Sequence, residues 1–184
     1  MCGGYEGGKK CFLYKQHQWM PWTNMGTARS YASALQINRN QALIIGGYNE
    51  NYRPLKTTEL TSSSGSEEGK AFPATIVFHC SFPFNATHAI VTGGLQDGSL
   101  FNSTNTWFVD LTTTRVTPGP TMKTGRYYHG CSIFQQGTKY FGIISGGINS
   151  AKVHLDSTEI IDLDQESPKW TKGMQEDKSK IVYR

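Results

Sequence analysis

The chain has 184 residues, of which 17% are charged and 37% are hydrophobic, and its formal net charge is +4. Its apolar residues form no run near the ~18 that a membrane-spanning helix needs. Its Lys and Arg residues are scattered rather than gathered into a stripe that would bind nucleic acid. The composition therefore excludes membrane insertion by this segment and nucleic-acid binding, and it is typical of an ordinary β-rich domain.

Four Gly-Gly pairs follow apolar stretches of the chain, and successive pairs of these four begin 43, 47 and 53 residues apart. Three of them close runs that are typical of buried strands, at 42–45, 89–92 and 141–145. Glycine permits the positive φ of a tight strand end, and near-regular spacing of this length is typical of propellers and other repeat arrays. The sequence therefore predicts a β-repeat protein. The pairs are Gly3-Gly4, Gly46-Gly47, Gly93-Gly94 and Gly146-Gly147.

A polar strand entry follows each of the last three pairs, at 55–60, 101–105 and 155–160. Glu59 and Glu159 fall in the same column of these entries, and each entry leads into a β-prone stretch. The sequence therefore predicts a third strand after each pair.

A fourth strand follows a polar turn and carries Trp22 or Trp170, with Val116 in that place in the intervening copy. The segments 25–29 and 122–126 then begin with Met and end with Arg, and each opens the next strand. Each unit is therefore expected to contain four short strands.

These residues resemble the kelch repeat, a unit of roughly 50 residues that forms one blade of a β-propeller. The kelch pattern runs from an Arg near the first strand, through a Gly-Gly closing the second, to a Trp near the fourth. The resemblance implies an all-β, partial propeller of about three to four four-stranded blades, which leaves the ring open because closure takes about four to eight. The matching residues are Arg29, Gly46, Gly47 and Glu59 in one copy, Gly93 and Gly94 in the next, and Arg126, Gly146, Gly147, Glu159 and Trp170 in another.

The repeat divides the chain into five segments. We expect 1–24 to end one blade, 25–71 and 119–173 to form blades, 72–118 to form a divergent blade without the starting Arg, and 174–184 to begin the next. This arithmetic favours a fragment of a larger kelch-domain protein, with a short protein that closes its ring by oligomerising as the alternative.

The four cysteines fall into two pairs. Cys2 and Cys11 flank the first Gly-Gly turn on neighbouring strands, where a disulfide forms if their Cα atoms approach to ~5.5 Å. Cys80 and Cys131 fall on the first strands of successive units, and we expect them to be buried free thiols, with a bridge as the alternative. A Cys2–Cys11 bridge would favour an extracellular location.

Two sequons point weakly to the same location. Asn85 begins one in an apparent turn, and Asn102 begins the other at a strand entry. Both are candidate glycosylation sites if the protein is secreted.

No catalytic or metal site is predicted. The five histidines are distributed over different units without a repeated ligand spacing, and the cysteines form no C-x-x-C hook. A propeller oxidase, which needs clustered His and Tyr ligands, is therefore only a remote alternative. We expect no cofactor.

The remaining function is non-catalytic binding of a protein or peptide, or scaffolding, because propellers present loops around a central mouth. The alternative for the arginines is that they satisfy hydrogen bonds between units. The candidate contact residues are Arg29, Tyr31, Tyr52, Arg53, Arg126, Tyr127 and Tyr128.

Two settings fit this function. The cysteines and sequons favour an extracellular recognition or adhesion protein. The repeat alone fits equally well a cytoplasmic kelch adaptor, such as the substrate receptor of a ubiquitin ligase.

Overall fold

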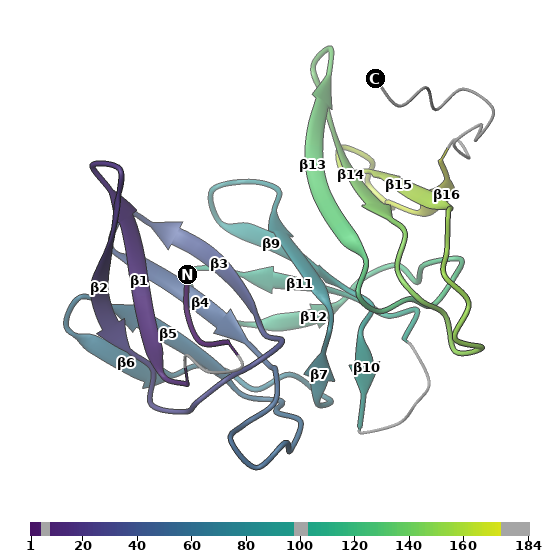
Figure 1. Ribbon diagram of the computed structural model, residues 1–184. Helices are drawn as coiled ribbons and strands as arrows, with labels where there is room; N and C mark the ends of the chain where they lie inside the picture. Colours follow the sequence, from purple (N-terminus) through teal and green to yellow (C-terminus); the bar gives the residue numbers. More distant parts are fainter. Residues whose placement is uncertain (5–7, 98–102, 174–184) are drawn as a thin grey trace, which may run out of the picture.

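The computed structural model describes residues 1–4, 8–97 and 103–173 (Figure 1). These residues form β-strands joined by turns and contain no helix, so the all-β prediction is confirmed. Accordingly, no helix long and apolar enough to span a membrane occurs in this part of the chain.

Three four-stranded antiparallel sheets follow one another along the chain, and each is a simple meander in sequence order. Sheet I contains β3 (Ser33–Asn38), β4 (Gln41–Ile45), β5 (Thr58–Ser62) and β6 (Gly65–Glu68). Sheet II contains β8 (Cys80–Pro83), β9 (His88–Thr92), β11 (Thr106–Asp110) and β12 (Val116–Pro118). Sheet III contains β13 (Gly130–Gln136), β14 (Lys139–Ser145), β15 (Thr158–Asp162) and β16 (Trp170–Lys172).

Two smaller pairs complete the fold. An N-terminal hairpin contains β1 (Lys10–Lys15) and β2 (Gln18–Asn24), and β7 (Ile76–Val77) pairs with β10 (Leu95–Gln96) beside sheet II. The hairpin and sheets I to III lie within 1–24, 25–71, 72–118 and 119–173, whereas 174–184 lies outside the described residues. The sheets of the described residues do not close into a ring (Figure 1).

The last three Gly-Gly pairs lie directly after the second strands of the sheets, β4, β9 and β14. The second glycine of each of these pairs has a φ of +86° to +90°, and a Cβ there would lie only 2.6–2.7 Å from a carbonyl oxygen of the segment that precedes the first strand. No other residue permits this approach without a shift of the backbone. The glycine–oxygen pairs are Gly47 with Ser30, Gly94 with Val77, and Gly147 with Tyr127.

Each sheet packs on the next through an apolar interface. Leu43 and Ile45 of sheet I form one buried cluster with Ala89 and Val91 of sheet II. Between sheets II and III, the buried Trp170 donates a hydrogen bond of 2.9 Å from Nε1 to the Thr106 hydroxyl. Sheet II is therefore covered on both faces.

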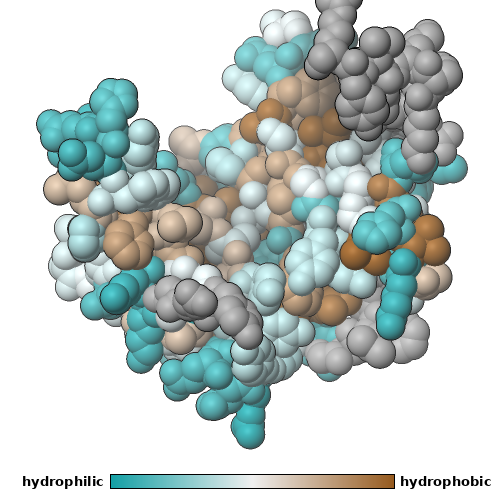
Figure 2. All heavy atoms as spheres, viewed as in Figure 1, coloured by the Kyte–Doolittle hydropathy of each residue, from teal (hydrophilic) through white to brown (hydrophobic). Residues whose placement is uncertain are grey.

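The outer face of sheet III is less covered. The rings of Phe134 and Phe141 stack there with centroids 5.3 Å apart, and Phe134 is 37% exposed. Figure 2 shows the hydrophobic side chains that gather along the β13–β14 hairpin, at the top of the view.

Both cysteine pairs are disulfide-bonded, with Cα–Cα distances of 4.0 Å for Cys2–Cys11 and 5.9 Å for Cys80–Cys131. The expectation that Cys80 and Cys131 are free thiols was therefore wrong. The first strands of successive sheets lie side by side, so β8 and β13 bring the two thiols together. Two disulfides are compatible with an extracellular location.

The two disulfides are expected to differ in their contribution to stability. Replacing Cys80 and Cys131 together by serine should lower the free energy of unfolding by about 2–4 kcal/mol, because the bridge closes a long loop in the unfolded chain. Its sequence separation is 51 residues, against 9 for Cys2–Cys11, so the matched Cys2/Cys11 serine pair should lose less. Urea unfolding of both variants without reductant measures the difference. An equal or larger loss for the Cys2/Cys11 variant would contradict this account.

Candidate functional site

Arg29, a candidate contact residue, lies inside the protein. Its side chain is 1% exposed and forms an ion pair with Glu59, with Nε 3.1 Å from Oε1. Its Nη1 donates to the carbonyl oxygens of Gly46 and Thr57 at 2.8 and 2.9 Å. The guanidinium group therefore joins the end of the second strand to the third strand of sheet I.

Arg126 has the equivalent position in sheet III. Its side chain is 0% exposed, its Nη2 lies 3.1 Å from Glu159 Oε1, and its Nη1 donates to the carbonyl oxygens of Gly146 and Ser157. Burial thus removes Arg29 and Arg126 from the candidate contact surface. The alternative expectation, that they satisfy hydrogen bonds between units, is not met either, because the hydrogen bonds of each guanidinium group lie within its own unit.

Three aromatic residues form a row across the sheets. Tyr31, Phe78 and Tyr128 precede β3, β8 and β13, and their φ values are +55°, +56° and +57°. The Phe78 N–H donates to the Tyr31 carbonyl at 3.3 Å, and the Tyr128 N–H donates to the Phe78 carbonyl at 3.0 Å. The left-handed conformation is rare for bulky residues and costs on the order of 1–3 kcal/mol, and such strain clusters at ligand sites.

Two further tyrosines complete a cluster that we call the aromatic surface: Tyr31, Tyr48, Phe78, Tyr127 and Tyr128. The Phe78 ring is at its centre, with centroid distances of 4.2 Å to Tyr128, 4.7 Å to Tyr31, 5.6 Å to Tyr48 and 6.2 Å to Tyr127. Tyr31 and Tyr128 are 46% and 52% exposed. The cluster therefore combines a packed centre with two solvent-exposed tyrosine rings.

The Tyr128 hydroxyl group of the aromatic surface stays protonated. Partial burial raises the pKa of Tyr128, and the neighbouring Tyr31, Tyr48 and Tyr127 raise it further. The Tyr128 hydroxyl is therefore a neutral hydrogen-bond donor near pH 7.

Two histidines follow the row and are buried beneath it. Burial lowers the pKa of His79 to about 3, helped by the nearby His129, and lowers that of His129 to about 4, helped by Arg126. Nε2 of His79 is hydrogen-bonded to the Ser33 hydroxyl at 2.7 Å, and Nε2 of His129 to the Thr92 hydroxyl at 2.8 Å. Both imidazoles are therefore neutral near pH 7 and link each sheet to the preceding one.

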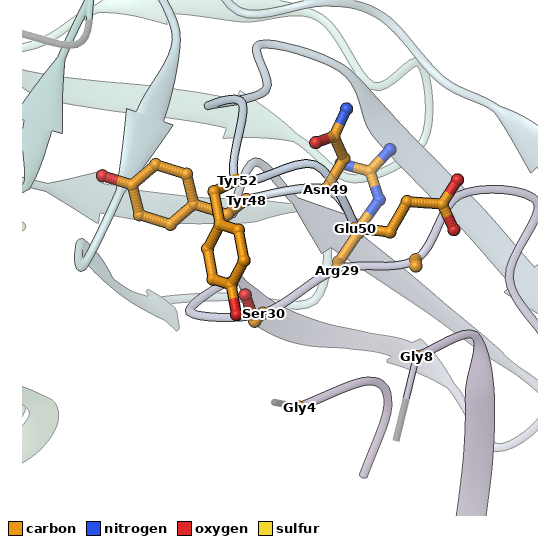
Figure 3. Close-up of a pocket in the computed structure, with 9 residues that line it drawn as sticks. Gly4, Gly8, Arg29, Ser30, Tyr48, Asn49, Glu50 and Tyr52 are labelled. Atoms are coloured by element: carbon orange, nitrogen blue, oxygen red, sulfur yellow. The ribbon is translucent and has the colours of Figure 1, made fainter. Parts of the chain in front are cut away.

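A pocket of about 160 Å³ lies beside Tyr48 (Figure 3). Tyr48 and Tyr52 lie on one side of it, and Asn49 and Glu50 lie on the other. Tyr52 is 64% exposed, and the exposed Arg53 follows it on the same loop. Small-molecule sites usually measure about 300–1,000 Å³, so this pocket is smaller than a typical ligand cavity.

The two sequons have different positions. Asn85 is exposed in the turn between β8 and β9, where its Oδ1 accepts hydrogen bonds from the backbone N–H groups of Thr87 and His88 at 2.9 and 2.7 Å. Asn102 lies outside the described residues.

The sequence analysis missed Phe78. Phe78 has no nearby Arg to mark it, but a positional signal exists, since an aromatic residue stands two positions before the first strand of every sheet. Tyr48 directly follows a Gly-Gly pair and bridges the loop at Ser30, so it marks the same end of sheet I.

Metal ligands do not gather in the part of the chain that the structure describes: no three His, Cys, Asp or Glu residues there are placed to hold a metal ion.

No family model and no curated protein matches the chain. Among solved structures, that of YjhT matches with a TM-score of 0.76 and 15% sequence identity. The match covers 96% of this chain and 62% of YjhT, so the chain spans less than two thirds of the length of that protein. At this identity the likeness concerns the fold alone.

The kelch assignment made from the sequence is therefore corrected. No family model supports it, and the described sheets are small antiparallel sets that do not close a ring. The physical reason is that the Gly-Gly, Arg and Glu positions serve local geometry. The glycines end the second strand of a meander sheet, and the Arg and Glu residues form a buried ion pair within it. These positions therefore predict the strands but do not define a family.

Proposed function

We propose that this chain is a non-catalytic protein-binding module and that it binds its partner through the aromatic surface. The observation that carries the proposal is the row of Tyr31, Phe78 and Tyr128, three aromatic residues in left-handed conformations of which two expose about half of their surface. Tyrosine supplies rigid contact area at low entropic cost and is enriched among residues that dominate binding energy. The buried arginine–glutamate pairs are engaged in internal hydrogen bonds, which leaves them unsuited to catalysis.

We further propose that sheets I to III are consecutive blades of a β-propeller. Two features support this arrangement: β3, β8 and β13 are neighbours, and each sheet packs on the next. In a propeller the aromatic surface would lie at one end of the axis, where loops of several blades meet.

An extracellular setting is part of the proposal. Disulfides persist in oxidising compartments and are rare in cytosolic proteins, which argues against a cytosolic adaptor. The exposed Asn85, in its hydrogen-bonded turn, would be available to a glycosylation enzyme in the same compartment.

Selection of binders from a random peptide library tests the proposal. Asn tolerates the left-handed conformation. Replacing Tyr31 or Tyr128 by Asn should lower the affinity for the selected peptides by about tenfold or more, which corresponds to about 1.4 kcal/mol or more. The control is Tyr140→Asn, because Tyr140 is 43% exposed but lies outside the aromatic surface. The proposal would be refuted if the selected peptides bound both variants as tightly as the unchanged protein, or if the library yielded no binding peptide.

A further inference from the structure

We infer that the aromatic surface accepts an extended, proline-containing segment of its partner, in the polyproline II conformation. This inference rests on the proposed function and names the chemistry of the ligand. It follows from the ring geometry, the charge and the rigidity of the surface.

The ring geometry suits a chain of pyrrolidine rings. Tyr31 and Tyr128 flank Phe78, and their planes are inclined to it by 61° and 40°. The two tyrosine rings are nearly perpendicular to each other, at 81°, with centroids 6.2 Å apart. Aromatic side chains set at such angles offer faces and edges to successive residues of a segment, and proline-rich segments are recognised through aromatic side chains.

The charge of the surface favours a neutral segment. Arg29 and Arg126 are paired with Glu59 and Glu159, and the two buried histidines are neutral. The tyrosine hydroxyls are donors, whereas proline has a carbonyl acceptor and no N–H group. A segment rich in proline therefore presents acceptors to these donors without burying an unpaired N–H.

The rigidity of the surface lowers the entropic cost of binding. The backbones of Tyr31, Phe78 and Tyr128 are hydrogen-bonded in series, so the row is ordered before the ligand arrives. A polyproline II segment is likewise preformed in solution. Two preformed partners lose little conformational freedom on association.

Titration of the full chain with an end-blocked decaproline peptide tests the inference, with an end-blocked Gly/Ser peptide of equal length as the comparison. Decaproline should bind the unchanged protein and Tyr140→Asn equally, at least about tenfold more tightly than the Gly/Ser peptide. Tyr31→Asn and Tyr128→Asn should each weaken it by about tenfold or more, and Tyr31→Phe, which keeps the ring, by less. Thermal unfolding confirms that each variant is folded.

Three results would overturn the inference: equal binding of the two peptides, decaproline binding that does not depend on Tyr31 and Tyr128, or tyrosine-dependent binding of the neutral oligosaccharide maltohexaose instead of decaproline. The first two leave the proposed function intact if library peptides without proline still bind through these tyrosines. If neither decaproline nor any library peptide binds the unchanged protein, both the inference and the proposed function are wrong.

Discussion

Lowering the pH from 7.5 to 5.0 is expected to reduce the free energy of unfolding by about 4 kcal/mol, because two histidines are buried in neutral form. In the folded protein the pKa is lowered by burial to about 3 for His79 and about 4 for His129. In the unfolded chain a histidine takes up its proton near ~6.5. Between these values the unfolded chain binds more protons, so stability is complete above about pH 6.5 and falls by about 1.4 kcal/mol per histidine per pH unit below it.

Urea unfolding between pH 7.5 and 5.0 measures this dependence. Among the described residues, the groups that face His79 are the Ser33 hydroxyl and His129, and those that face His129 are the Thr92 hydroxyl and Arg126. Within this part of the chain, neither imidazole therefore has a carboxylate that would stabilise its proton. The double variant His79→Gln/His129→Gln should unfold with little pH dependence.

The matched control for this experiment is His17→Gln, since His17 is exposed in the turn of the N-terminal hairpin. This variant should retain the full pH dependence of the unchanged protein. A free energy of unfolding that stays constant from pH 7.5 to 5.0 in the unchanged protein would show that the histidines are solvated.

Replacement of Glu159 by glutamine is expected to destabilise the protein by about 3–5 kcal/mol, because it leaves the charge of Arg126 buried and unpaired. The Glu159 carboxylate also accepts hydrogen bonds from the backbone N–H groups of Lys123 and Thr124 at 2.7 and 2.9 Å. A glutamine of the same shape offers a single acceptor oxygen in place of two, so one of these donors would lose its partner.

Chemical denaturation of Glu159→Gln at pH 7.5 measures this loss. Lys139→Met is the comparison, because it breaks the ion pair with Asp162 at a side chain that is 56% exposed. Exposed pairs contribute about 0–1 kcal/mol, so this variant should remain close to the unchanged protein. Similar losses in the two variants would mean that the Arg126–Glu159 pair is solvated.

The strands were the part of the fold that local sequence could predict. Three of the Gly-Gly pairs mark the ends of β4, β9 and β14 because only glycine accepts the left-handed turn and the close carbonyl contact there, so the residue type itself reveals the position. The family could not be inferred in the same way, since these local requirements recur wherever such sheets pack in series.

The candidate site was harder to predict because its properties depend on residues far apart in the sequence. The buried Arg29 is paired with the carboxylate of Glu59, which is 30 residues away in the sequence. The centre of the aromatic surface is Phe78, which belongs to the repeat that lacks the arginine. The Cys80–Cys131 bridge shows the same limit. Cys80 pairs with Thr92, the last residue of β9, and Gly130 pairs with Ser145, the last residue of β14. Gly130 is therefore the counterpart of Cys80 in sheet III, and Cys131 lies one position further along. The two cysteines meet only because β8 and β13 are adjacent.

The double coverage of sheet II has a consequence for cooperativity. Its one face shares the cluster of Leu43 and Val91 with sheet I, and its other face holds the Thr106–Trp170 hydrogen bond to sheet III. Sheet I is covered in the same way, because Ile44 on its other face packs with Cys11 of the N-terminal hairpin and with Met25. Opening the hairpin or sheet III therefore breaks one interface, whereas opening sheet I or sheet II breaks two. Sheets I and II are the last of the described units to exchange their amide hydrogens, and unfolding begins at the hairpin and at sheet III.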